Sequence, residues 1–269
     1  MPEHCPDMPD DLSGLPPASQ AELRELLARI GQTYATHFEV MDVDGSPLHL
    51  LTIDDMNHHI DGLLAREGLH NPLNDLAHFA RSRPDALHSL MKAMPLWAKV
   101  WPASFLFGRY LRKCAPEGRS LLELGAGCGV TSLVASRYGF ASIVVSDIEE
   151  DALCFARANV LRNNLQDVCA VRRVDVVNTR LDARFDRIVA AELLYLDELH
   201  RPLLKFVQRH LAAGGQALFC TDMARRKKRF FKLAEKEFRV SEQLVGMRSL
   251  GADGREERRA YCIHILERP

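Results

Sequence analysis

The residues that most directly indicate chemistry are three glycines spaced two apart and an aspartate further along the chain. Gly125, Gly127 and Gly129 follow a short apolar run that contains one acid, Glu123. Glycines in this pattern permit a tight turn and let a ligand approach the backbone, because no Cβ intervenes. Asp147 lies 22 residues after Gly125 (147 minus 125), where a βαβ unit places a carboxylate to accept hydrogen bonds from ribose hydroxyls. The stretch predicts a nucleoside-cofactor site.

Two residues bear on which nucleoside the loop favours. A dinucleotide loop has a third glycine at the position of Val130, so that the following helix packs closely with its N-terminus toward pyrophosphate. Glu123 puts a negative charge where phosphates would lie, which disfavours an anionic ligand and suits a cationic one. S-adenosylmethionine carries a sulfonium and an ammonium group and no phosphate, so we expect it beside Glu123. NAD, and a glycine turn without a ligand, remain the alternatives.

A second set of candidate residues follows a later apolar run. The run 185–191 ends in Glu192-Leu193-Leu194-Tyr195. Methyl transfer from a sulfonium is an in-line displacement, so the enzyme mainly has to position the attacking lone pair. Glu192 can hydrogen-bond and orient an ammonium group, while Tyr195 supplies an aromatic wall and a hydroxyl. We expect both to be catalytic, with Glu192 orienting the amine first and accepting a proton second. A helix-capping acid is the alternative for Glu192.

The same turn indicates the kind of methyl acceptor. Enzymes that methylate exocyclic base amines place Asn or Asp before two prolines there, and Leu193-Leu194 lacks those prolines. The basic run 225–229 can attract phosphates, but such runs are more often solvated helix faces. The net charge of −1 gives no general reason to expect nucleic acid or an acidic membrane as a partner. We therefore expect an amine other than a nucleic-acid base.

The elements that must position these residues alternate along the chain. Alternating strands and helices predict an α/β fold with a Rossmann-like, mostly parallel sheet, whose ligand lies at the carboxyl ends of the strands. Asp175, the acid that follows the third expected strand, or its neighbouring backbone would meet the adenine amine there. We expect strands at 120–124, 141–145, 170–174, 185–191 and 217–221, helices at 103–113, 130–138, 149–162, 199–211 and 225–237, and a terminal antiparallel hairpin at 238–247 and 260–266.

The N-terminal third is predicted to be an extension of this domain. We expect a mobile tail over 1–18, a helix and hairpin extension over 19–95 that acts as a lid or substrate platform, and the cofactor domain over 96–269. Ser19 and Glu22 have the spacing of a capping box that would begin the first helix. A hairpin around Asp44-Gly45 and a broken helical pattern over 54–94 would follow.

Cysteines and histidines give no metal signal in their local spacing. The seven cysteines include no C-x-x-C pair, which implies neither a disulfide framework nor a zinc site and indicates reduced core cysteines. His58 and His59 are adjacent and would point to different faces of a helix. The first residues lack the features of a signal peptide, and no apolar run approaches membrane-spanning length. We expect a soluble, cytoplasmic protein without a membrane or metal partner.

A tryptophan just before the cofactor domain is a further candidate. Pro102 is well placed to begin a helix, directly after Trp101. A tryptophan one element before the glycine loop can cover the cofactor pocket, and we favour Trp101 over Trp97 for this role. The alternative is that both side chains belong to the core.

The segment from about 97 to 237 resembles the class I, seven-β-strand methyltransferases. Within them it is similar to the protein-lysine methyltransferases, a group that includes the electron-transfer-flavoprotein and calmodulin lysine methyltransferases. The motifs that carry the resemblance are Val100-Trp101-Pro102-Ala103, Leu122-Glu123-Leu124-Gly125-Ala126-Gly127-Cys128-Gly129, Ser146-Asp147 and Ala190-Ala191-Glu192-Leu193-Leu194-Tyr195.

The resemblance implies roles for individual residues. Glu192 and Tyr195 would shape the acceptor site. Many relatives carry a tryptophan after the third-strand acid, where this chain has Val176, so the resemblance supplies no adenine-stacking residue there. The implied cofactor contacts are Trp101, Gly125, Ala126, Gly127, Asp147 and Ala191.

These features together predict an S-adenosylmethionine-dependent N-methyltransferase that releases S-adenosylhomocysteine. The expected acceptor is a lysine side chain of a protein. A small-molecule N-methyltransferase that uses the same residues is one alternative, and a non-catalytic binding module with a methyltransferase fold is another. The oligomeric state is left open.

Overall fold

The computed structural model describes residues 12–66, 94–225, 227–250 and 256–269. The start of the expected tail, Cys5, and the region 67–93 with His70, His78 and His88 lie outside these residues. Among the residues described, we find no helix with both the length and the apolar character needed to cross a bilayer.

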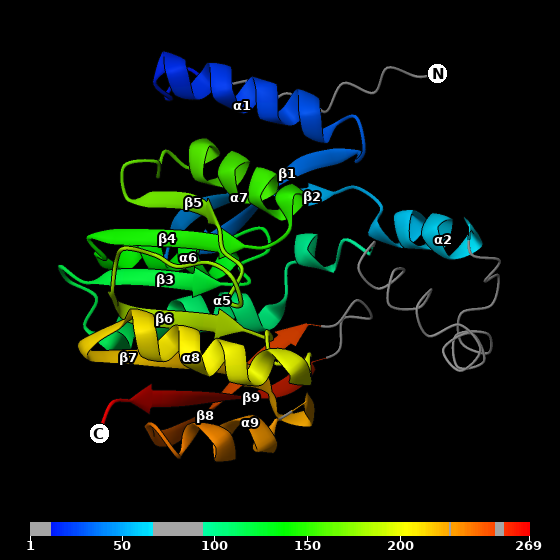
Figure 1. The fold of residues 1–269 in the computed structure, drawn as a ribbon. Coiled ribbons are helices and arrows are strands. Elements are labelled where there is room, and N and C mark those ends of the chain that lie inside the picture. The colour runs from blue at the N-terminus through cyan, green and yellow to red at the C-terminus, as the bar shows by residue number, and fades with distance from the viewer. Residues whose placement is uncertain (1–11, 67–93, 226, 251–255) are drawn as a thin grey trace.

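A seven-stranded sheet forms the centre of the molecule (Figure 1). Five neighbouring strands are parallel, and the strand β9 is antiparallel to both of its neighbours. The order is β5-β4-β3-β6-β7-β9-β8, so the chain changes direction across the sheet at β3. This confirms the expected Rossmann-like α/β fold with a terminal antiparallel hairpin. The strands are β3 (Ser120–Leu124), β4 (Ser142–Asp147), β5 (Cys169–Arg173), β6 (Phe185–Ala191), β7 (Leu211–Asp222), β8 (Arg239–Leu250) and β9 (Glu256–Glu267).

Helices cover both faces of the sheet, which is why the parallel strands are apolar on both sides. Leu121 belongs to the core shared with α5 (Pro102–Tyr110), α6 (Val130–Ala135) and α7 (Glu150–Arg162). Its neighbour Leu122 belongs to the core under α8 (His200–His210) and α9 (Lys228–Ala234). Short 3₁₀ turns connect several elements: η1 (Leu96–Ala98), η2 (Leu111–Cys114), η3 (Ser136–Tyr138), η4 (Asp197–Leu199) and η5 (Met223–Arg225).

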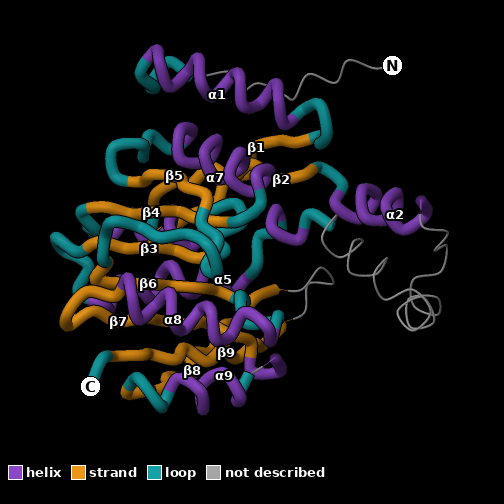
Figure 2. Tube along the Cα trace, viewed as in Figure 1, coloured by secondary structure: helices purple, strands orange, loops and turns teal. Residues whose placement is uncertain are grey.

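The N-terminal extension packs at the β5 end of the sheet. It contains α1 (Pro17–Ile30), a separate hairpin of β1 (Thr36–Val43) and β2 (Ser46–Ile53), and α2 (Met56–Arg66). The predicted turn is confirmed, because Asp44 and Gly45 both have positive φ, at 51° and 84°. Figure 1 shows α1 beyond α7, at the end of the molecule opposite to β8 and α9. The hairpin forms a separate two-stranded sheet, and Figure 2 shows its strands beside α7.

Two local predictions were wrong at element boundaries. The N-cap of the first helix is Pro16 and α1 begins at Pro17, so Ser19, the expected N-cap, lies inside α1 and the capping box does not form. Glu22 instead accepts two hydrogen bonds from Arg157 of α7, at 2.6 and 2.7 Å. The fifth strand also begins early, because Gly214 and Gly215 belong to β7, where the pairing with β6 shifts register.

Candidate active site

The glycine loop connects β3 to α6 and requires glycine at two positions. Gly125 and Gly127 have φ of 62° and 55°, the left-handed region that favours glycine. A Cβ added at Gly127 would overlap the carbonyl oxygen of Trp97, and one added at Gly125 would lie 2.5 Å from Cδ1 of Leu193. Cys128 N also donates to the same Trp97 oxygen at 3.1 Å. The loop is therefore shaped by its contacts with two other segments.

Asp147, at the end of the neighbouring strand β4, holds this loop. Its Oδ2 accepts a hydrogen bond of 2.8 Å from Gly127 N. Its Oδ1 accepts from the backbone N–H groups of Ile148 and Glu149 at 2.7 and 3.1 Å. A carboxylate offers about four lone-pair sites, so these three bonds leave one position on Oδ2 for a further donor. The structure thus joins the glycine loop and Asp147, the two parts of the predicted cofactor motif. The contact of Asp147 with ribose stays a prediction.

Glu123 of β3 lies in the core, with its carboxylate against the first turn of α6. Only 1% of the residue is exposed, and its carboxylate accepts hydrogen bonds from N and Oγ of Ser132 at 3.0 and 2.5 Å. Burial raises the pKa of Glu123 to about 7, against the lowering effect of the Ser132 hydrogen bonds, and Asp147 adds to the rise. Glu123 thus supports the glycine loop from the interior, while its predicted contact with the cofactor is not tested by this geometry.

Glu192 begins the predicted acceptor motif in an unusual backbone conformation. It follows β6 with a φ of 53°, which costs a non-glycine residue about 1 to 3 kcal/mol. Its N–H donates to Cys220 O at 2.9 Å, and its Oε1 accepts from Asp222 N at 2.6 Å. Both partners belong to β7, so the carboxylate is held across the ends of two strands. Strain of this kind is common at functional sites.

Tyr195 lies at the end of the same turn, and its side chain is exposed to solvent. The residue is 68% exposed. Partial desolvation, together with the carboxylates of Asp147, Glu149 and Glu198, raises the pKa of its hydroxyl. Leu193 of the same turn lies against Gly125 of the glycine loop, which places the acceptor motif beside the cofactor motif.

The two tryptophans have different surroundings. The side chain of Trp97 is partly buried, and its ring packs edge-on against Tyr34 and Phe155 at the border of the core, with centroids 5.8 and 4.9 Å away. Trp101 is partly buried, donates from Nε1 to Leu96 O at 3.0 Å and carries Lys99 Nζ at 4.8 Å from its ring. Both side chains are partly buried, so the choice of Trp101 over Trp97 for contact with the cofactor stays a prediction.

The remaining predicted cofactor residues lie at the same edge of the sheet. Ala126 N donates to Ser146 O at 2.9 Å, and Ala191 ends β6. Asp175 follows β5, where the N–H of Val177 and the side chain of Asn178 donate to its carboxylate and lower its pKa. All of them therefore sit at the carboxyl ends of parallel strands, as predicted for a ligand site.

Sequence reasoning missed Asn159, a fully buried residue of α7. Its Oδ1 accepts a hydrogen bond of 2.6 Å from Leu51 N of the hairpin, and its Nδ2 donates to Cys128 O of the glycine loop at 2.9 Å. One side chain thereby connects the N-terminal extension to the cofactor loop. An asparagine between apolar residues of a predicted helix was the available signal, since buried polar groups require partners.

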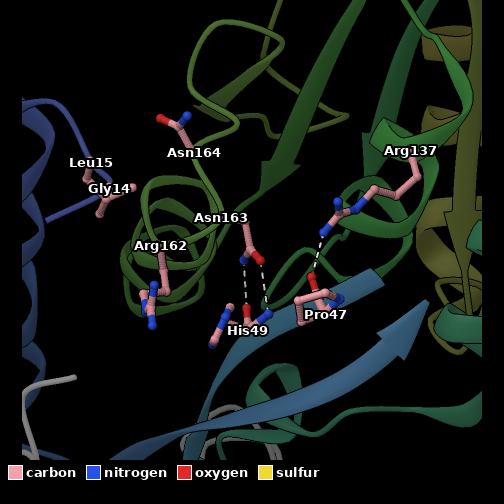
Figure 3. Close-up of a pocket in the computed structure, with 8 residues that line it drawn as sticks. All are labelled: Gly14, Leu15, Pro47, His49, Arg137, Arg162, Asn163 and Asn164. Carbon is pink, nitrogen blue, oxygen red and sulfur yellow. Dashed lines mark hydrogen bonds between the residues drawn. The ribbon is translucent and has the colours of Figure 1, made fainter. Parts of the chain in front are cut away.

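A cavity of about 370 Å³ lies elsewhere, between the hairpin and the ends of α6 and α7 (Figure 3). There His49 and Asn163 exchange two hydrogen bonds, at 2.9 and 2.7 Å, and Arg137 donates to Pro47 O at 2.7 Å. Burial, with Arg162 and Arg137 nearby, lowers the pKa of His49. None of the predicted site residues lines this cavity, which belongs to the packing of the extension.

Comparison with protein families supports the resemblance to protein-lysine methyltransferases. A family model described as lysine methyltransferase matches residues 93–237. The electron transfer flavoprotein beta subunit lysine methyltransferase of Mus musculus is 29% identical over 133 residues, which cover 49% of this chain and 51% of that protein. The protein N-lysine methyltransferase METTL21A of Danio rerio is 31% identical over 161 residues, 56% of this chain and 72% of that protein. The chain thus spans about half the length of the first of these relatives.

A solved structure shows the same fold. Precorrin-6y C5,15-methyltransferase from Geobacter metallireducens superposes with a TM-score of 0.50 at 15% identity, covering 60% of this chain and 86% of that one. At this identity the likeness concerns the fold alone.

Proposed function

The chain belongs to the lysine methyltransferase family, and from this premise we propose that it transfers a methyl group from S-adenosylmethionine to a lysine side chain of a protein. The family match confirms the resemblance carried by the glycine loop and the Glu192 turn. The two relatives are named as lysine methyltransferases of proteins, which supports a protein acceptor over a small molecule.

The observation that carries the proposal is the contact between the two motifs. Leu193, the residue after Glu192, lies against Gly125, so that a Cβ at this glycine would be 2.5 Å from its Cδ1. The residues proposed to bind the cofactor and those proposed to bind the amine thus meet at one point, where the sheet changes direction. An in-line transfer between two substrates requires this adjacency.

The proposed cofactor site uses the ends of β3, β4, β5 and β6. Asp147 would accept a ribose hydroxyl on Oδ2, and Glu123, buried beneath the glycine loop, would favour a cationic ligand in its ionised form. The backbone of the glycine loop would lie along the methionine part of the cofactor. The further contacts we propose are Trp101, Gly125, Ala126, Gly127, Asp175 and Ala191.

Glu192 and Tyr195 would act on the acceptor. The lysine amine must be neutral when it attacks, so its ammonium form would first give a proton to Glu192 or to solvent. The N–C bond would then form as the C–S bond breaks, with the electron pair of that bond going to sulfur. Glu192, fixed by the 2.6 Å hydrogen bond from Asp222 N, would orient the amine and stabilise its developing positive charge. Tyr195 would provide an aromatic wall at the open side of the site.

We propose that the protein is located in the cytoplasm. The described cysteines are all buried and form no disulfide with one another, as in proteins of a reducing compartment.

Calorimetric binding of S-adenosylmethionine tests the cofactor part of the proposal. Wild-type protein is expected to bind, and Asp147→Asn should weaken binding by about 1.5 to 3 kcal/mol, the scale of one charge-assisted hydrogen bond. Asp186→Asn is the matched control, because Asp186 also accepts backbone and side-chain hydrogen bonds, from Ser120, but at the other end of β3. Equal affinity of wild type and Asp147→Asn would reject the ribose assignment.

A further inference from the structure

The terminal hairpin brings together three side chains of metal-binding types. Among the residues that the structure describes, Glu242, Cys262 and His264 form a group whose candidate ligand atoms all lie within 4.8 Å of one another. Glu242 of β8 pairs directly with His264 of β9, and Cys262 is two residues from His264 along the same strand. Side chains two apart on a strand, and directly opposite on its partner, share one face of a sheet.

The separations between the three donor atoms match those of a tetrahedral metal site. Cys262 Sγ lies 3.7 Å from His264 Nε2 and 3.7 Å from Glu242 Oε2, and Nε2 lies 3.4 Å from Oε2. An ion bound at usual zinc distances to sulfur, nitrogen and oxygen requires its ligands to be about 3.3 to 3.6 Å apart. The donors therefore need to move by only a few tenths of an ångström to coordinate one ion.

The surroundings of the three residues suit a bound ion. Cys262 and His264 are 0% and 3% exposed, so two donors are shielded from water. The imidazole of His264 stacks on the ring of Phe231 from α9, with centroids 3.3 Å apart and planes 6° apart, which fixes its orientation. The side chain of Glu242 is 50% exposed, which gives an ion a route from solvent.

We propose that Glu242, Cys262 and His264 bind one divalent ion of the zinc class. A thiolate and an imidazole select zinc-like ions over magnesium or calcium, which prefer oxygen ligands. Two anionic ligands would balance the charge of the ion, and a fourth position would be left for water. Cys262 pairs with Thr221 of β7, directly before Asp222, so the ion would brace the hairpin against the strand end that holds Glu192.

Titration of the chelator-treated full chain with Co²⁺ tests the proposal. A tetrahedral Co²⁺ site with a thiolate gives d–d bands in the visible range and a sulfur-to-cobalt charge-transfer band, and we expect both at one equivalent, with displacement by Zn²⁺. Cys262→Ser should remove the charge-transfer band. Cys154→Ala, which removes another buried thiol with carboxylates nearby, should retain it.

Glu242→Gln provides a second test that does not depend on a core substitution. Loss of this half-exposed ligand should raise the dissociation constant for Zn²⁺ about tenfold or more. It should also abolish most of the rise in melting temperature that Zn²⁺ gives the wild type. Absence of the charge-transfer band in the wild type, its persistence in Cys262→Ser, or equal Zn²⁺ affinity of Glu242→Gln would overturn the proposal. The three side chains would then be a hydrogen-bonded network only.

Discussion

Oε1 of Glu192 accepts a 2.6 Å hydrogen bond from the backbone N–H of Asp222, across the carboxyl ends of β6 and β7. Because Glu192 also has a φ of 53°, its carboxylate is held in place at a cost in backbone strain. The charge of this residue and its backbone conformation can be tested separately.

The charge of Glu192 is tested by Glu192→Gln. The amide oxygen can still accept from Asp222 N, so the turn should keep its shape while the negative charge is lost. We expect the rate of methyl transfer to fall about 100-fold or more, as when one group that stabilises transition-state charge is removed. S-adenosylmethionine affinity, measured by calorimetry, should stay within about twofold. An unchanged transfer rate would remove Glu192 from the mechanism.

The backbone conformation of Glu192 is tested by comparing Glu192→Gly with Glu192→Ala. Both variants lack the carboxylate, so they differ only in how well they tolerate the positive φ. We expect the glycine variant to be the more stable by about 1 kcal/mol, whereas at an ordinary strand or helix position glycine is the less stable. Urea unfolding of the two proteins gives this difference. A more stable alanine variant would mean that the turn is not left-handed in solution.

The shape of the glycine loop is tested by Gly127→Ala against Gly139→Ala. Both glycines have positive φ, but a Cβ at Gly139 would meet nothing closer than 3.9 Å, whereas one at Gly127 would overlap Trp97 O. Gly139→Ala should cost about 1 to 2 kcal/mol of stability from strain alone. Gly127→Ala should cost more, and should also weaken S-adenosylmethionine binding. Equal costs, with equal affinities, would argue against the contact between the loop and Trp97.

The burial of Glu123 predicts a pH-dependent stability. The pKa of Glu123 in the folded protein is about 7, above its ordinary value of 4.5, so the folded state binds this proton more tightly than the unfolded state. The resulting stabilisation is complete below pH 4.5 and is lost as the pH rises to about 7. Relative to Glu123→Gln, the free energy of unfolding of the wild type should fall by about 2 to 3 kcal/mol between pH 5 and pH 8.

Urea unfolding of both proteins at these two pH values measures the effect. The glutamine keeps an acceptor for the hydrogen bonds from Ser132, so the comparison isolates the titration. If the difference in free energy of unfolding between the two proteins is the same at both pH values, Glu123 is ionised over the whole range.

The parallel sheet was predictable because its signals are local. Ser120–Leu124 and Phe185–Ala191 have the predicted bounds, since each closes with apolar residues and is followed directly by a glycine or an acid. The boundaries that failed depend on contacts with distant residues. Glu22 has the spacing of a capping-box residue but pairs with Arg157 of α7. Gly214 is of a residue type typical of a helix end but lies in β7, where the pairing with β6 shifts register.

The candidate site was predictable as separate motifs but not as an assembly. Glycine spacing and the two acids identify Gly127, Asp147 and Glu192, but the donors that hold the acids are backbone N–H groups, which every residue type except proline supplies. The group formed by Glu242, Cys262 and His264 had no local signal for a different reason. It depends on the register of β8 against β9, which places Glu242 directly opposite His264.

The most direct measurement is transfer of a radiolabelled methyl group from S-adenosylmethionine into a lysate of the source cell. Wild type and Glu192→Gln would be run in parallel, with the products separated on a gel. We predict label in a protein band with the wild type, on a lysine identified by mass spectrometry, and at least about 100-fold less with Glu192→Gln. Label in the small-molecule fraction alone, or in neither fraction, would contradict the proposed protein-lysine methyltransferase.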